Sequence, residues 1–201
     1  FYLPEAIDIS RQDGLAVHYA ETHDNNRLAA RSKTFARMRT ALCALLSHQG
    51  GFGFANGVEW LADVKINVHE AHPLNWGAPD NLVDHLRRLH ILLRSHPAFF
   101  QEVEMEFIHR SEGNAVVVRR SHKPSGKGLI IAVNLDDQKE VSVRWKTDPE
   151  MPGPHFIDLL SGRDVETTTQ PDQDCGLLLA PGQVLCLTGD ENDLQYLRQP
   201  K

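Results

Sequence analysis

The sequence has few cysteines, and none of them are spaced as a disulfide framework or a zinc knuckle requires. Cys43, Cys175 and Cys186 are an odd number, and no two of them form a Cys-x-x-Cys pair. No apolar run approaches the roughly 18 residues of a membrane span, and no basic-then-apolar leader opens the chain. These absences argue against a disulfide-stapled or membrane-bound protein and favour a reducing, cytoplasmic location.

An excess of basic residues is also lacking. The 21 lysines and arginines are outnumbered by 27 acids, are scattered along the chain, and leave a formal net charge of -6. We therefore expect no nucleic-acid partner and no membrane partner. What is present is a hydrophobic content of 41% over 201 residues, enough to bury an ordinary globular core. The chain begins at Phe1 rather than Met, which predicts either a piece of a longer polypeptide or a trimmed one.

The first half of the chain has the pattern strand, helix, strand, helix. Residues 15–20 are short and apolar, as in a buried strand. Ser32 is the predicted N-cap of a helix whose apolar residues recur at three- and four-residue spacing. Residues 51–56 predict a second, glycine-rich strand, and Asp80 is the predicted cap of a second helix that ends ahead of Pro97.

From residue 102 onward the hydrophobic period changes from helical to extended. Short strands separated by turn residues are predicted at 103–109, 115–120, 129–134, 141–145, 155–160, 176–179 and 184–188. Alternation in an antiparallel sandwich places an inner set of side chains, which we expect to be Ile131, Val133, Val141, Val143, Leu178 and Leu185. The change of period predicts two units, α/β over 1–100 and all-β over 101–201.

The stretch just beyond the first predicted strand carries the residues with most chemistry. Glu21, His23, Asp24 and Arg27 follow one another there, and in α/β barrels this edge of the sheet is where active sites are built. A carboxylate can stabilise positive charge at the anomeric carbon of a sugar, and a histidine can hydrogen-bond sugar hydroxyls. The competing interpretation is a solvated polar loop that caps the next helix.

Glu21-Thr-His-Asp24 followed by Arg27 resembles the fourth conserved region of the α-amylase superfamily, glycoside hydrolase family 13, at the end of its seventh barrel strand. The features that follow stand in the order of that family. They are a helix over 37–46, a glycine-rich eighth strand, the Gly57-Val-Glu-Trp60 stretch and a helix that ends in Arg94-Ser-His-Pro97. Residues 130–135, 156–162 and 178–185 are similar to strands of the β-sandwich behind the family's barrel, so the resemblance covers nearly all of the chain.

This resemblance implies the last two βα units of a (β/α)8 barrel over 1–100 and a C-terminal antiparallel β-sandwich over 101–201. Asp24 matches the transition-state-stabilising acid and His23 the sugar-binding histidine, with Glu21 and Arg27 as further substrate-binding candidates. Thr22 stands where the family usually has Asn. The family's nucleophilic Asp and general-acid Glu lie on strands that would precede this chain, so the resemblance implies that the isolated chain is inactive.

The function implied is hydrolysis or transfer of glucosyl units on α-glucans such as starch or glycogen. The expected partners are an α-glucan and the missing N-terminal part of the same polypeptide, with no cofactor and no metal. The alternative is a non-catalytic protein that binds or scaffolds carbohydrate without cleaving it. The two hypotheses differ in whether the intact protein has the nucleophilic Asp and the general-acid Glu ahead of this chain.

The long loop over 57–79 is a second candidate region, because loops longer than about 12 residues are usually functional or disordered. Trp60 and Trp76 are candidates for stacking on sugar rings, with packing of the loop as the alternative. Glu59 is equally suited to anchoring the loop and to touching substrate. His69 and His72 are three residues apart in this loop and lack the helical i,i+4 spacing of a zinc site, so we expect no metal.

Overall fold

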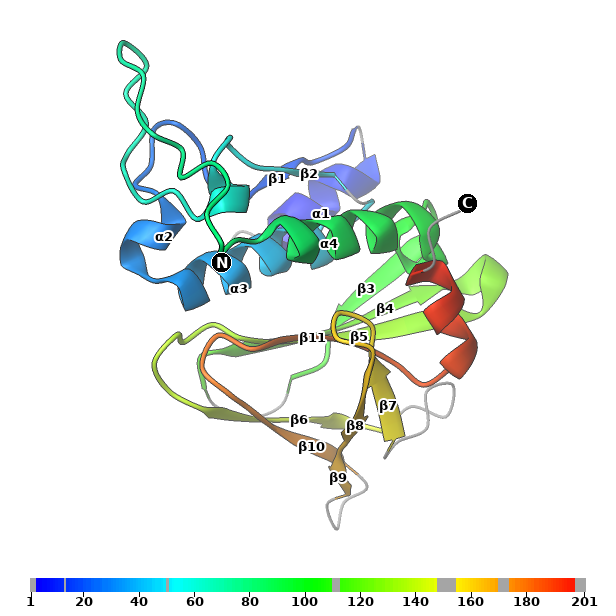
Figure 1. The fold of residues 1–201 in the computed structure, drawn as a ribbon. Helices are drawn as coiled ribbons and strands as arrows, with labels where there is room; N and C mark the ends of the chain where they lie inside the picture. Colours follow the sequence, from blue (N-terminus) through cyan, green and yellow to red (C-terminus); the bar gives the residue numbers. More distant parts are fainter. Residues whose placement is uncertain are drawn as a thin grey trace.

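The computed structural model describes residues 3–12, 14–49, 51–109, 113–147, 155–169 and 174–197. These residues form layers, with helices on one side of a six-stranded sheet and a three-stranded sheet on its other side (Figure 1). The structure thus combines helices with antiparallel sheets, as the change of hydrophobic period predicts.

The first half of the chain supplies the helical layer. Its elements are α1 (Leu3–Gln12), β1 (His18–Tyr19), α2 (Leu28–Arg31), α3 (Lys33–Leu45), β2 (Phe52–Gly53), the 3-10 turn η1 (Val58–Trp60), α4 (Val83–Ser95) and the 3-10 turn η2 (Pro97–Phe99). β1 and β2 pair in parallel, with His18 opposite Phe52 and Tyr19 opposite Gly53. Both predicted strands are therefore present but short, and α1 was not predicted.

The two long helices begin in different ways. The Ser32 hydroxyl accepts a hydrogen bond from the Phe35 amide at 2.9 Å, which confirms the predicted cap of α3. The predicted helix α4 is present, but its predicted cap, Asp80, was wrong. The Asp80 carboxylate pairs with Lys33 on α3 at 2.5 Å, and the Asn81 side chain accepts from the Val83 amide instead. Lys33 on α3 thus binds the carboxylate that was predicted to cap α4.

The second half of the chain supplies both antiparallel sheets. The six-stranded sheet has the order β3 (Val103–Phe107), β4 (Ala115–His122), β5 (Lys127–Asn134), β11 (Val184–Thr188), β7 (His155–Asp158) and β8 (Arg163–Glu166). The three-stranded sheet has the order β6 (Val141–Lys146), β10 (Asp174–Leu179) and β9 (Thr168–Thr169). All seven predicted strands are present; β8, β9 and the 3-10 segments η3 (Lys123–Ser125) and η4 (Glu191–Leu197) were not predicted.

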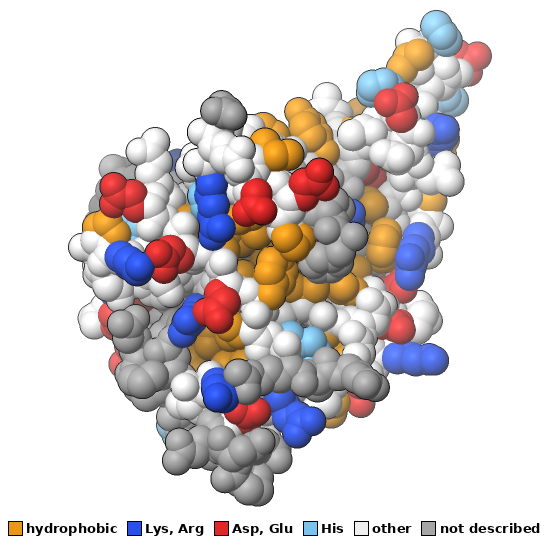
Figure 2. Space-filling model, turned by 180° about the vertical axis from the view of Figure 1, so that it is seen from behind, with side chains coloured by type: hydrophobic (Ala, Val, Ile, Leu, Met, Phe, Trp, Pro, Cys, Tyr) orange, Lys and Arg blue, Asp and Glu red, His pale blue; other side chains and the backbone are white. Residues whose placement is uncertain are grey.

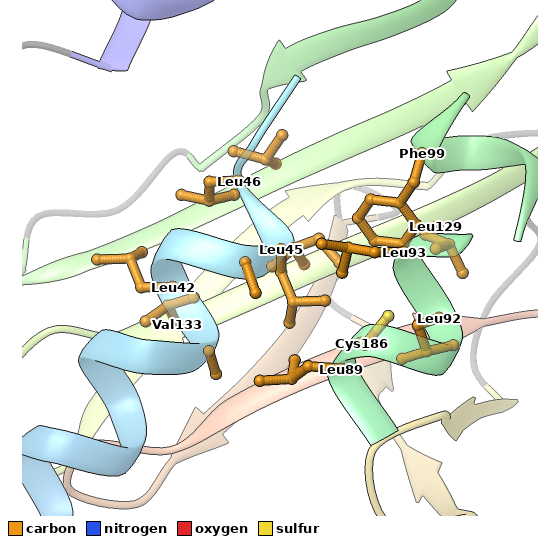
Figure 3. Packing of buried hydrophobic residues seen from close by; sticks show 14 of the residues in the cluster. Leu42, Leu45, Leu46, Leu89, Leu92, Leu93, Phe99, Leu129, Val133 and Cys186 are labelled. Atoms are coloured by element: carbon orange, nitrogen blue, oxygen red, sulfur yellow. The ribbon is translucent and has the colours of Figure 1, made fainter. Parts of the chain in front are cut away.

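The six-stranded sheet is buried on both faces by different partners. On β5, Ile131 and Val133 join the core that α3 and α4 form with the sheet, where leucines of both helices converge (Figure 3). Ile130 and Ala132 point the other way, into the core between the two sheets. The first hundred residues therefore pack on the sheet, as predicted, and β4, β5 and β11 each contribute side chains to both cores.

Val143 and Leu185 lie inside the sandwich as predicted, and Val141 packs against that core. Ile131 and Val133 are corrections, because they are buried on the opposite face of the six-stranded sheet, against the helices.

Leu178 is the third correction. Its side chain is 61% exposed, while Leu179 beside it is fully buried. On β10 the inward face is carried by Cys175, Leu177 and Leu179, so the predicted alternation was out of step by one residue. Among the described residues, no helix has both the length and the apolar character needed to cross a membrane.

Candidate functional site

The loop after β1 has a buried level and an exposed level. Backbone hydrogen bonds from the amides of His18 and Ala20 to the carbonyls of Gly51 and Gly53 fix the start of this loop against β2. Beyond Ala20, the side chains of the predicted site residues separate by burial. Glu21 and Arg27 are 4% and 1% exposed, whereas the side chains of His23 and Asp24 are 60% and 78% exposed.

The buried level is an ion pair that joins the two ends of the loop. Arg27 Nη1 lies 2.6 Å from Glu21 Oε1, and Glu21 Oε2 accepts from the Leu28 amide at the start of α2 at 2.7 Å. Burial raises the pKa of Glu21 above its ordinary value, and the Leu28 amide and the Arg27 charge oppose that rise. Arg27 Nη2 also donates to the carbonyl of Asn56 at 2.7 Å, which ties this loop to the segment after β2.

The exposed level presents a carboxylate beside an imidazole. His23 Nε2 lies 3.3 Å from Asp24 Oδ1. The turn below them is closed by the Thr22 hydroxyl, which donates to Asn25 Oδ1 at 2.8 Å. Thr22 therefore shapes the turn at the position where the resembling family usually has Asn. An exposed carboxylate and imidazole held on a fixed turn can meet a ligand from solvent.

Gly57 is the point where the two loops touch most closely. Its φ is +96°, and a Cβ at this position would lie 2.0 Å from Arg27 Nη2. The Glu59 carboxylate accepts from the Gly57 amide at 2.8 Å, and the Glu59 carbonyl accepts from the Leu82 amide at 2.8 Å. Of the two roles considered for Glu59, the structure shows it anchoring the loop.

Trp60 and Trp76 form an aromatic pair on the loop after β2. Their ring centroids are 5.3 Å apart with the planes inclined by 41°, and Trp76 is 78% exposed. They border a hollow of about 590 Å³ on the outer side of α4, which also has Asn56 at its edge. Because the Asn56 carbonyl binds Arg27, the aromatic hollow and the loop after β1 are physically connected.

Other residues of this hollow were not singled out from the sequence. Its lining includes Phe54 from the second loop and Arg87, His90 and Arg94 from α4. The last three recur at three- and four-residue spacing and thus share one side of the helix. That spacing was a signal for a common polar face, but it does not say what the face lines.

The remaining candidates lie apart from this arrangement. His69 and His72 belong to the segment that projects from the molecule at the upper left of Figure 1 and the upper right of Figure 2. His72 Nε2 is 3.9 Å from a Glu70 oxygen, and the described residues contain no group of three or more side chains placed to hold a metal ion. The Cys43 thiol is buried, and burial raises its pKa to about 11, so it stays protonated.

Hydrophobic side chains are exposed around β1. Leu15, Val17 and Tyr19 are 52%, 47% and 57% exposed. Figure 2 shows hydrophobic side chains gathered on the back of the molecule, the side turned away in Figure 1. A parallel pair of strands is normally covered on both faces, so this apolar surface is unusual for a finished sheet.

Solved structures provide the comparison with known proteins. The chain is similar to a γ-CGTase from alkalophilic Bacillus clarkii, with a TM-score of 0.67 and 17% identity over 90% of this chain. It is also similar to an α-amylase from Lactobacillus plantarum, with a TM-score of 0.62 and 16% identity over 92% of this chain. No protein-family model and no curated protein sequence matches the chain.

These likenesses show that the chain shares its fold with part of a CGTase and part of an α-amylase, which agrees with the fold that the resemblance implies. The chain spans 28% of the γ-CGTase structure and 44% of the α-amylase structure, which is less than half of either. The predicted roles of Asp24, His23, Glu21, Arg27, Trp60 and Trp76 are not tested by these likenesses and stay predictions.

Proposed function

Because the chain has an α-amylase-type fold, we propose that it is the C-terminal part of a polypeptide that hydrolyses or transfers glucosyl units on α-glucans such as starch or glycogen. In this proposal residues 1–100 are the end of a (β/α)8 barrel and residues 101–201 are a C-terminal β-sandwich. The observation that supports it most is the loop after β1. A buried Glu21–Arg27 pair there supports an exposed His23–Asp24 pair at the carboxyl end of a parallel strand.

The resemblance and the chemistry of the side chains suggest a role for each residue. Asp24 would stabilise the positive charge that builds on the sugar ring in an oxocarbenium-like transition state, and His23 would hydrogen-bond a sugar hydroxyl. Trp60 and Trp76 would stack on sugar rings. Glu21 and Arg27 would contribute to substrate binding by fixing the turn that carries His23 and Asp24, since both side chains are buried beneath it.

The remaining machinery would come from the preceding part of the same polypeptide. A retaining glycosidase needs two carboxylates about 5 Å apart. The structure has one parallel pair of strands in this region, whereas eight strands close such a barrel. The exposed hydrophobic side chains of Leu15, Val17 and Tyr19 are where further strands and helices of a barrel would pack.

The test is steady-state kinetics of the intact polypeptide on a soluble α-glucan. Asp24→Asn should lower kcat by orders of magnitude and change KM little, because a neutral amide cannot offset charge that exists only in the transition state. His23→Ala should weaken binding and turnover together. Asp164→Asn is the matched control, since this exposed carboxylate lies on β8 in the sheet region.

Wild-type turnover in Asp24→Asn, with the fold confirmed by circular dichroism, would rule out Asp24 as the stabilising acid. The loop from Glu21 to Arg27 would then be a helix-capping loop. The alternative of a non-catalytic carbohydrate-binding protein is supported by the aromatic hollow at Trp60 and Trp76, which needs no upstream acid. An intact polypeptide that binds maltoheptaose but has no turnover in its wild-type form would favour that alternative.

A further inference from the structure

A second hollow, of about 580 Å³, lies between α3, α4 and the turn that joins β7 to β8. In Figure 1 that turn is the yellow loop below α4. The residues that line the hollow come from both halves of the chain, but none belongs to the loops over 21–27 or 57–79. The hollow adjoins the aromatic hollow at α4, since both are lined by Arg87 and Ile91, but it contains none of the residues to which the proposed function assigns a role.

The lining of this hollow is rich in positive charge. Four arginines contribute to it, Arg37, Arg87, Arg88 and Arg163, against the single carboxylate of Asp84. The whole chain has a formal net charge of -6 with its basic residues scattered. Such a local excess of guanidinium groups is therefore not a consequence of the overall composition.

The four arginines differ in whether their side chains already have a partner in the protein. Arg87 forms an ion pair with Asp84, and Arg88 Nη1 donates to the Leu160 carbonyl at 2.8 Å. Among the described residues, neither Arg37 nor Arg163 has a carboxylate within ion-pair distance. Two guanidinium groups from separate elements therefore border the same hollow without an acidic partner.

The turn that carries Ser161 and leads into Arg163 is stabilised by hydrogen bonds. Asp158 is 3% exposed, and its two carboxylate oxygens accept from the amides of Leu160 at 3.1 Å and Ser161 at 3.0 Å. The Arg163 amide donates to Ser161 Oγ at 3.3 Å. The hydroxyl hydrogen of Ser161 remains able to donate, which adds a neutral donor beside the arginines.

His85 of α4 also lines this hollow, as does Arg37 of α3. Burial together with the Arg37 charge lowers the pKa of His85 to about 4. His85 is thus neutral near pH 7 and does not repel a cation beside it.

We propose that this hollow binds a phosphate group, either as free inorganic phosphate or as the monoester of a small sugar. A guanidinium presents two parallel N–H donors that match two phosphate oxygens. A phosphate dianion is attracted to several arginines more strongly than a singly charged carboxylate is. The volume is within the roughly 300–1,000 Å³ of small-ligand sites. It therefore has room for a sugar ring beside the phosphate.

The experiment is isothermal titration calorimetry of the protein at low salt with inorganic phosphate, glucose 6-phosphate and glucose. We expect saturable binding of at least one of the two phosphates and none of glucose. Arg37→Gln and Arg163→Gln should each weaken that binding at least tenfold. Both side chains are free of acidic partners among the described residues, so the fold should tolerate their replacement. Arg144→Gln, on the exposed side of β6, is the matched control and should bind as the wild type does.

The two sources of the phosphate are distinguished by their affinities. Glucose 6-phosphate that binds more than tenfold tighter than inorganic phosphate assigns the site to a sugar monoester, and equal affinities assign it to free phosphate. The proposal is overturned if neither compound binds saturably, or if the Arg37→Gln, Arg163→Gln double variant binds as the wild type does. Neither result depends on Asp24, so this proposal and the proposed function can fail separately.

Discussion

At the residue scale, the loop after β1 shows what a motif predicts and what it leaves open. The order Glu21, His23, Asp24, Arg27 predicted a cluster of charges at the end of a strand, and the structure places them there. It did not predict which of them are buried. Burial of Arg27 depends on the Asn56 carbonyl, 29 residues further along the chain, and on the absence of a side chain at Gly57.

Gly57 gives a test of this arrangement. Gly57→Ala should destabilise the protein by roughly 2–4 kcal/mol, from a positive φ that disfavours a Cβ and from the clash with Arg27. Arg27 cannot move aside without breaking its contacts with Glu21 and Asn56. Gly77→Ala is the control, because Gly77 also has a positive φ but open space around it, and should cost only about 1 kcal/mol. Urea denaturation measures both, and equal losses would contradict the close packing inferred for Gly57.

At the element scale, strands and helices were predicted where apolar residues gather, and they were missed where such residues are few. β8 reads Arg-Asp-Val-Glu and has one partly buried residue, so it carries no hydrophobic signal. In β10 three consecutive leucines give no alternation, which is why Leu178 was placed on the wrong face. The continuous apolar run of β5 likewise led to the wrong face for Ile131 and Val133. In α1, Ile7 is the only large apolar residue in a core among the side chains that the structure describes, too little for a visible helical period.

Arg120 is an element-scale contact that no local pattern reveals. It is fully buried on β4, and its guanidinium donates to the carbonyls of Leu45, Ser47 and His48 at the end of α3, and of Ala98 beyond α4. Carbonyls at a helix C-terminus lack partners within the helix. One cation from the sheet therefore satisfies the ends of the helical layer and favours the negative end of the α3 dipole.

Replacing that cation should be costly. Arg120→Met should lower the free energy of unfolding by at least about 3 kcal/mol, because it leaves several buried carbonyls without donors. Arg119→Met, the next residue on the strand, changes a partly exposed ion pair with Glu106 and should cost no more than about 1 kcal/mol. Urea unfolding followed by circular dichroism compares the two. A loss at Arg120 as small as that at Arg119 would show that water replaces the guanidinium at these carbonyls.

At the scale of the whole molecule, the face of the six-stranded sheet under α3 and α4 is covered, whereas hydrophobic side chains around β1 are exposed. The core under α3 and α4 includes residues from both halves of the chain, so the helices and the six-stranded sheet are stabilised together. Beyond those helices, β1 and β2 form a sheet of two strands. The hydrophobic side chains around β1 lie where nothing among the described residues covers them fully.

The exposed surface around β1 predicts self-association of the chain when it is studied alone. Exposed apolar surface and unpaired strand edges both favour contact between copies, so sedimentation velocity at rising concentration should show species larger than the monomer. Leu15→Lys combined with Val17→Lys should shift the chain toward monomer, because two like charges would oppose burial of that surface. Leu178→Lys is the matched control, since Leu178 is similarly exposed but lies on the three-stranded sheet, and it should leave the association unchanged. A wild-type chain that stays monomeric at every concentration, or an equal effect of Leu178→Lys, would show that the surface around β1 is not an interface that needs a covering partner.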